Sequence, residues 1–180
     1  PAKWLRWSGI EQCWLEVFVK FDCDAGLSEI LRPLPRAFPD HDYSALRLRH
    51  PECGQRVEIQ PLVQCWLGNL AEHLTQGSIL TIDYGGTPET IYHRRPGGSL
   101  RGYFKQARVE GAGVYRRFGK QDLTVDVNFR DLIAWGEDFG LETVFEESQA
   151  EFLQRHGEGA DAMAGAGPGE AFRVLLQRQD

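Results

Sequence analysis

The stretch GQRVEIQPLVQCWLGNLAEHLTQGSILTIDYGG, residues 54–86, decides the fold of this chain. Within it, 56–60 reads as a short strand. Apolar residues then recur at the spacing of a helix that begins at Pro61 and stops before Gly77. The apolar run 78–84 follows at once and leads into two glycines, as a buried parallel strand does. Because a helix followed by such a strand is the second half of a βαβ unit, the stretch predicts an α/β fold.

The sequence before this stretch has the two-residue period of β-strands. Residues 2–8 and 12–20 are rich in aromatic and β-branched side chains that alternate with polar ones. Ser8-Gly9 supplies a turn between them, so we expect a β-hairpin. Residues 32–55 are rich in proline, arginine and histidine and are interpreted as a loop.

The sequence after this stretch mixes loops, helices and strands. An amphipathic helix is expected at 129–139, and Gly140 is its stop signal. Ser148 and Gln149 are interpreted as the start of a further helix. The expected order is a loop at 87–98, an extended or mixed segment at 99–109, the helix at 129–139, a strand at 141–148, a short helix at 149–157, a Gly/Ala-rich loop at 157–169 and a strand at 170–177.

Composition narrows the classes of function. The net charge of −6 argues against general nucleic-acid binding, which needs a basic surface, and is compatible with a basic peptide as substrate. No run of 18 apolar residues is present, so no membrane span is expected.

The five histidines are interpreted as surface or loop residues. The four cysteines show no metal-ligand spacing and are interpreted as buried thiols in a reducing compartment; they are Cys13, Cys23, Cys53 and Cys65.

Five segments follow one another in an order typical of a known family. They are the 54–85 stretch ending in Asp-Tyr-Gly, SLRGYFKQ at 99–106, KQDLTVDVNF at 120–129, ESQAEFLQRHG at 147–157 and GEAFRVLLQ at 169–177. Together they resemble the MidA-like class I S-adenosylmethionine-dependent methyltransferases, the mitochondrial complex I assembly methyltransferases. Near the N-terminus, Trp14-Leu15-Glu16 resembles a Trp-x-Glu strand of the same family.

The resemblance implies the C-terminal half of a Rossmann-like class I methyltransferase sheet. The last strand, 170–177, is then expected to be antiparallel and to lie between 78–84 and 141–147. Residues 1–60 would form a β insertion that contains the hairpin, and 61–180 would carry a helix and the fifth to seventh strands. Because Pro1 aligns with the end of the family's fourth strand, we expect the cofactor-binding half to be absent from this chain.

The resemblance also implies S-adenosylmethionine as the cofactor of the complete protein. Such a site needs a Gly-rich turn after the first strand and an acidic residue after the second, for close backbone approach and for the ribose hydroxyls. Gly85-Gly86 and Gly97-Gly98 do not follow a first strand and are not expected to precede a helix. We therefore expect no cofactor site, and no metal site, in this chain.

Seven residues are candidates for the substrate side, and each has a structural alternative. Asp83 and Tyr84 follow the 78–84 strand, where the family faces its substrate, but Asp83 can instead cap a turn and Tyr84 can pack. Arg101 and Tyr103 can bind an acidic group or line a peptide groove; Arg101 can equally pair with a carboxylate of the domain.

Three more candidates lie in the 120–129 segment. Asp122, Thr124 and Asp126 could attract a guanidinium, because carboxylates accept its forked donors. Thr124 and Asp126 could equally cap the helix that starts near Phe129.

The resemblance points to methylation of a protein arginine side chain. The implied substrate is a protein, with a respiratory-complex subunit as an example, in the bacterial cytoplasm or the mitochondrial matrix. The alternative is a non-catalytic fragment or protein-interaction module. We also expect self-association, because the uncharged 78–84 strand would present an open edge without a fourth strand beside it.

Overall fold

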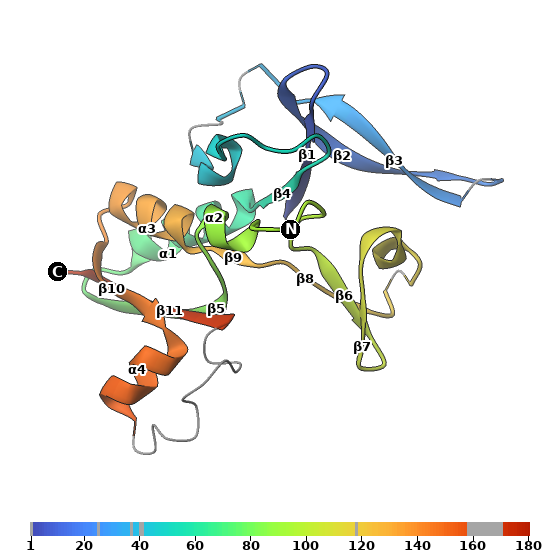
Figure 1. Cartoon of the computed structure of the whole chain (residues 1–180). Coiled ribbons are helices and arrows are strands. Elements are labelled where there is room, and N and C mark those ends of the chain that lie inside the picture. The colour runs from blue at the N-terminus through green and yellow to red at the C-terminus, as the bar shows by residue number, and fades with distance from the viewer. Residues whose placement is uncertain (1, 25, 37, 40–41, 118, 158–170) are drawn as a thin grey trace. The chain divides into compact units, whose positions relative to one another are not determined.

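The protein forms two compact units, each built from two separate stretches of sequence. Unit 1 comprises residues 1–61 and 88–125, and unit 2 comprises 62–87 and 126–180 (Figure 1). The computed structural model describes residues 2–24, 26–36, 38–39, 42–117, 119–157 and 171–180. The predictions for His41 and for nearly all of the Gly/Ala-rich loop lie outside the described residues.

The larger sheet of unit 1 has four antiparallel strands in the order β3-β2-β1-β4. The expected hairpin is confirmed, with β1 (Lys3–Ser8) paired to β2 (Cys13–Asp22), and so is the short strand as β4 (Arg56–Ile59). Leu5 on β1 lies opposite Val57 on β4, and both are fully buried. The core of this unit therefore starts where β1 meets β4.

The loop prediction for residues 32–55 is only partly correct. Strand β3 (Gly26–Pro33), which the sequence did not suggest, reaches into this range, and a short 3-10 helix, η2 (Ser44–Arg47), lies inside it. Strand β3 forms by pairing along the second half of β2, from Leu15↔Pro33 to Asp22↔Gly26. Its own residues show no clear alternation, so tertiary pairing rather than local propensity makes this strand.

The second stretch of unit 1 forms a smaller sheet in the order β7-β6-β8. Strands β6 and β7 make a tight hairpin because Lys105 and Gln106 both adopt positive φ angles, 49° and 66°, as a two-residue turn requires. The expected loop at 87–98 contains one helical turn. The bounds are α2 (Pro88–Ile91), β6 (Arg101–Phe104), β7 (Ala107–Val109), the 3-10 helix η3 (Gly111–Tyr115) and β8 (Asp122–Thr124).

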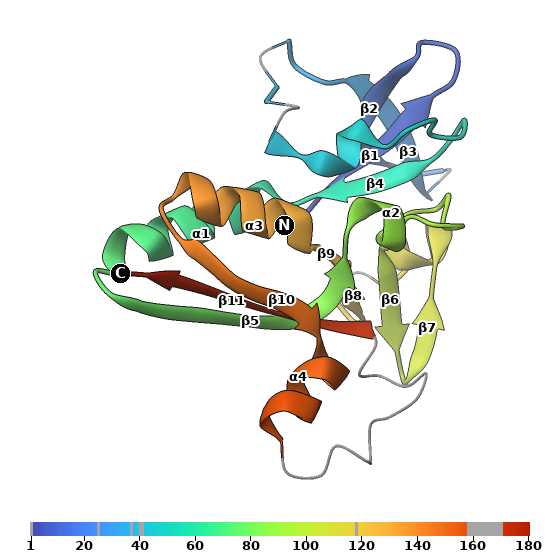
Figure 2. The same cartoon turned by 60° about the vertical axis from the view of Figure 1, so that its left-hand side comes forward.

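Unit 2 contains a mixed sheet in the order β10-β11-β5-β9 (Figure 2). The strands are β5 (Gly77–Gly86), β9 (Val127–Asn128), β10 (Glu142–Ser148) and β11 (Phe172–Gln179). Strand β11 is antiparallel to both β5 and β10 and lies between them, which confirms the predicted position of the last strand. Only the short β5–β9 pair is parallel among the described strands.

The three helices of unit 2 confirm the predicted helical segments. They are α1 (Pro61–His73), α3 (Phe129–Asp138) and α4 (Gln149–His156). Gly140 ends α3 with a φ of +84°, and Ser148 starts α4 with a capping box, as expected. The predicted cap of α3 is wrong. Asn128 caps this helix by accepting the Asp131 N–H, because it sits directly before the first turn, whereas Thr124 and Asp126 lie further upstream.

Helix α3 packs closely on one face of the unit 2 sheet. The Gln177 side chain of β11 is 1% exposed and donates to the Leu132 carbonyl of α3 at 3.4 Å. A Cβ atom on Gly136 would lie 1.8 Å from Gln177 Nε2, so only glycine allows this approach. Figure 2 shows α1 and α3 on the same side of β5 and β11.

The opposite face of β5 carries exposed apolar side chains. Ile79 pairs with Gln177, which points toward α3, so the next residue, Leu80, points to the other face, as does Ile82. Leu80 is 49% exposed and Ile82 is 44% exposed. On the edge away from β11, only Gly85 and Gly86 pair with another described strand. Unit 2 therefore has an open strand edge next to an apolar face.

The cysteine prediction is wrong. Cys23, Cys53 and Cys65 are exposed and Cys13 is partly exposed, because the loops, the start of β2 and the outer face of α1 that carry them do not enter the core. Each of the four described histidines is exposed, as expected. Within the described ranges, His, Cys, Asp and Glu side chains form no group of three suited to a metal ion.

Candidate functional site

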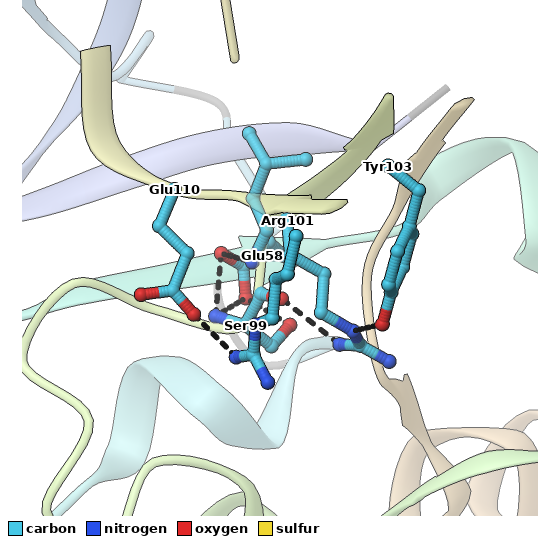
Figure 3. A network of polar contacts seen from close by, with 7 residues as sticks. Glu58, Ser99, Arg101, Tyr103 and Glu110 are labelled. Carbon is cyan, nitrogen blue, oxygen red and sulfur yellow. Dashed lines mark hydrogen bonds and ion pairs between the residues drawn. The ribbon is translucent and has the colours of Figure 1, made fainter. Parts of the chain in front are cut away.

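A buried carboxylate organises the center of unit 1 (Figure 3). Glu58, on β4, is 4% exposed and accepts the backbone N–H groups of Ser99 and Leu100 at 3.0 and 3.2 Å. The Ser99 and Tyr92 hydroxyls add hydrogen bonds of 2.7 and 3.2 Å to the same carboxylate. Burial raises the pKa of Glu58, and these hydrogen bonds oppose that rise.

The loop before β6 is held against Glu58 by a glycine. Gly98 has a φ of +83°, and a Cβ atom there would lie 2.4 Å from Glu58 Oε1 and 3.1 Å from Trp4 Nε1. Trp4 Nε1 is buried and has no hydrogen-bond partner in the described part of the chain. The close approach of backbone to carboxylate therefore fixes residues 98–100 and the strand that follows.

Four of the seven candidate residues come together on the small sheet of unit 1. The β6–β8 register places Arg101 opposite Thr124 and Tyr103 opposite Asp122. Arg101 is buried and donates to the Ser99 carbonyl at 3.1 Å and to the Tyr103 hydroxyl at 3.3 Å, as Figure 3 shows. These contacts give Arg101 a role in holding the sheet and leave its role toward an acidic ligand a prediction.

A hollow of about 330 Å³ adjoins this sheet. Its walls include Trp4, Glu58 and Thr124, and its other lining residues are mostly apolar. Its polar lining residues also include Lys3, which pairs with Glu16 at 3.0 Å. Tyr103 and Asp122 are exposed.

The other three candidates gather in unit 2, at the C-terminal end of β5. Gly85 pairs with Val127 in parallel, so the same register brings Asp126 level with Tyr84. The exposed Asp83 accepts the N–H of its neighbour Tyr84 at 2.7 Å, and both residues lie within strand β5 rather than in a turn. The Tyr84 ring packs on Phe172 with 3.8 Å between ring centroids. The three residues therefore lie at one end of the strand, with Asp83 on the opposite face of the sheet from Tyr84 and Asp126.

The glycine pairs do not fit the methionine part of an S-adenosylmethionine-type cofactor. At Gly85 a Cβ atom would lie 2.0 Å from the Val127 carbonyl oxygen, so the neighbouring strand already fills that approach. At Gly98 the Glu58 carboxylate fills it. The expectation that no helix follows Gly86 is wrong, because α2 begins at Pro88, although it has only four residues.

Sequence reasoning missed Glu58 and its partners. A single glutamate inside the short strand 56–60, flanked by Val57 and Ile59, was the available signal, because an acidic residue in a buried strand needs partners. The identity of those partners, Ser99 and Tyr92, depends on contacts between distant stretches that no local pattern predicts.

Comparison with known proteins identifies the family. Residues 1–146 match the family described as "Putative S-adenosyl-L-methionine-dependent methyltransferase". The chain belongs to this methyltransferase family. The match confirms that the chain belongs to a methyltransferase family and that the cofactor of this family is S-adenosylmethionine. It does not distinguish a MidA-like subgroup. No curated protein sequence matches the chain.

Two solved structures show the same fold as this methyltransferase family member. One is an uncharacterized protein from Burkholderia thailandensis, with 22% identity and a TM-score of 0.82; the match covers 99% of this chain and 52% of that protein. The other, from the same superfamily and organism, was solved bound to S-adenosyl-homocysteine, with 22% identity and a TM-score of 0.81 over 99% of this chain and 50% of that protein. The chain therefore spans about half the length of both structures. No described helix is long and apolar enough to cross a membrane.

Proposed function

We propose that this chain forms the acceptor side of an S-adenosylmethionine-dependent protein methyltransferase whose acceptor is an arginine side chain. The observation that supports this is the exposed Asp83 carboxylate at the end of β5, in a member of a methyltransferase family. A guanidinium presents forked donors that match carboxylates, so this end of unit 2 suits an arginine. The protein that carries this arginine could belong to the same class as the respiratory-complex subunits implied by the MidA-like resemblance.

The role of the Asp83 carboxylate is to orient the acceptor nitrogen and to receive a proton. An arginine nitrogen that gains a methyl group must lose one proton, and a nearby carboxylate is a suitable acceptor. Asp83 is exposed, and the N–H of its neighbour Tyr84 holds the carboxylate in place.

The proposal includes a cofactor-binding part outside the described residues. Its support is the poor fit of both glycine pairs to a cofactor, and the open edge of β5, where a further parallel strand could pair. The chain's coverage of about half of each similar structure agrees with this. The same open edge supports the second candidate function, an interaction module that associates through β5.

The test compares two aspartates in a version of the protein that includes a cofactor-binding part. Asp83→Ala should lower the transfer of radiolabelled methyl groups to an arginine-containing protein by at least about tenfold, the low end for a positioned acid or base. The matched control, Asp122→Ala, lies on β8 of unit 1 and should retain most activity. Normal activity of Asp83→Ala, with unchanged melting of both variants, would show Asp83 to be structural only.

A further inference from the structure

Unit 1 contains a basic hollow that the proposed acceptor site does not use. Its volume is about 370 Å³, and it is lined by residues 47–52, Gln55 and residues of the 88–96 segment. Four of its side chains have no hydrogen bond or ion pair with any residue that the structure describes: Arg49, His50, His93 and Arg94. Two guanidinium groups and two imidazoles thus present their donors to the hollow and to solvent.

The walls of this basic hollow are held together by one buried amide. Gln55 is 7% exposed, and its Nε2 donates to the Arg56 carbonyl at 2.8 Å and to the Arg95 carbonyl at 3.0 Å. The Arg56 N–H donates to the Pro96 carbonyl at 2.8 Å. These bonds tie the 47–56 and 92–96 segments to each other, so a ligand would meet a preformed surface and lose little to ordering it.

Two residues of the basic hollow are held in a strained backbone conformation. His50 and Arg94 have φ angles of +55° and +54°, and the described chain has only three other non-glycine residues with positive φ. This conformation costs an L-residue about 1 kcal/mol or more and tends to persist where it serves a function. Neither position carries the glycine or asparagine that adopts this conformation at lower cost.

A second, larger hollow continues from the first. It measures about 650 Å³ and shares Arg94, Arg95 and Pro96 with the basic hollow. Arg56 and Arg108 add positive charge to it, although Glu29 and Glu110 pair with them. The two hollows lie side by side on either side of residues 94–96.

We propose that these two hollows bind an acidic stretch of the protein substrate. This inference rests on the proposed function and names how the substrate is recruited, away from the reacting arginine. Carboxylates along an extended peptide would meet Arg49 and Arg94, whose forked donors match a carboxylate. A nucleic acid is disfavoured because the chain as a whole has a net charge of −6.

The test measures binding of a fluorescein-labelled peptide with aspartate at alternate positions, by fluorescence anisotropy on this chain. The double variant Arg49→Gln, Arg94→Asn should weaken binding by at least about tenfold, since two charge-assisted contacts are lost. Asparagine at 94 tolerates the positive φ, so the backbone is preserved. The control Lys120→Gln removes an exposed charge of unit 1 outside both hollows and should leave the affinity unchanged.

Further arms separate this inference from other ligands and from the proposed function. A peptide with asparagine in place of aspartate should not bind. Competition by inorganic phosphate at the peptide's own concentration, tighter binding of a single-stranded RNA, or equal loss in Lys120→Gln would each overturn the inference. Methyl transfer to the arginine protein without any acidic-peptide binding would overturn it while leaving the proposed function intact.

Discussion

Units 1 and 2 of this chain have opposite charge and different kinds of core. Unit 1 carries 16 Lys and Arg against 12 Asp and Glu, whereas unit 2 carries 4 against 14. Unit 1 is organised around a buried carboxylate, and unit 2 around strand pairing covered by α3. The chain's net charge of −6 is therefore the sum of a basic unit 1 and a strongly acidic unit 2.

This difference has a consequence for how each unit meets its surroundings. The positive charge of unit 1 comes mainly from residues 88–125, which hold 8 Lys and Arg against 3 Asp and Glu and include part of both hollows. In unit 2 the notable surface is the apolar face and open edge of β5. Charge should thus govern ligand binding in unit 1, and strand pairing should govern association in unit 2.

The largest effect is expected from removing the buried carboxylate of unit 1. Glu58→Ala leaves the Ser99 and Leu100 N–H groups without an acceptor and should cost about 3 kcal/mol of folding free energy. Amide hydrogen exchange should show lost protection in β4 and β6, while β5 and β11 of unit 2 stay protected.

Two further variants sharpen this result. Glu58→Gln keeps an acceptor oxygen and should lose less than half as much stability. Exposed Glu52 has no side-chain partner in the described ranges, so Glu52→Ala should have almost no effect. Equal loss of protection in both units after Glu58→Ala would show that the two units unfold together. It would contradict the expectation that unit 2 stays folded when unit 1 is destabilised.

A smaller effect is expected at the open edge of unit 2. We expect the chain to self-associate through β5, because unpaired backbone groups there adjoin the exposed Leu80 and Ile82. Ile82→Lys should weaken this association by about tenfold, or about 1.4 kcal/mol, since a charge on the apolar face opposes strand addition.

Light scattering at several concentrations measures this association. The control Val19→Lys changes an exposed apolar residue on β2 of unit 1 and should leave association as in the unaltered chain. If the unaltered chain stays monomeric at every concentration, the expected association through β5 is wrong.

The smallest effect is expected for an ion pair of unit 1. Arg56 donates two hydrogen bonds to Glu29, and these bonds, aided by the Arg56 charge and Tyr115, hold the pKa of Glu29 below its usual 4.5. Because the folded-state pKa is lowered, the stability from this pair is present above about pH 4.5 and is lost as the pH falls through the folded-state value. Glu29→Gln should therefore cost about 1 kcal/mol at neutral pH, and the difference from the unaltered chain should shrink in acid.

Denaturant unfolding between pH 3 and pH 7 measures the size of this difference. Glu110→Gln is the matched control, because its pair with Arg108 is exposed and should contribute almost nothing. A difference between Glu29→Gln and the unaltered chain that stays constant over this range would contradict the assignment.

The elements that could be predicted from the sequence are those with a regular apolar period, although β5 is neither buried nor mainly parallel as its apolar run predicted. The α1 helix and the β5 strand follow from apolar spacing in residues 61–84, and the β1–β2 hairpin follows from alternation. The family resemblance added the antiparallel β11 between β5 and β10, which spacing alone could not give. Of the candidate site, Asp83 and Tyr84 were predictable because they end a recognisable strand.

Pairing between distant stretches of the chain produced the features that no local pattern predicted. It formed β3 along β2, placed Asn128 rather than Asp126 at the start of α3, and left the cysteines outside the core. It also joined residues 88–125 to 1–61, which buries Glu58 against Ser99 and brings Arg49 and Arg94 to one hollow. The local sequence determines the secondary-structure propensity and the hydrophobic period of a single helix or strand. Which residues are buried, and which charges lie close together, depends on contacts between elements far apart in the chain.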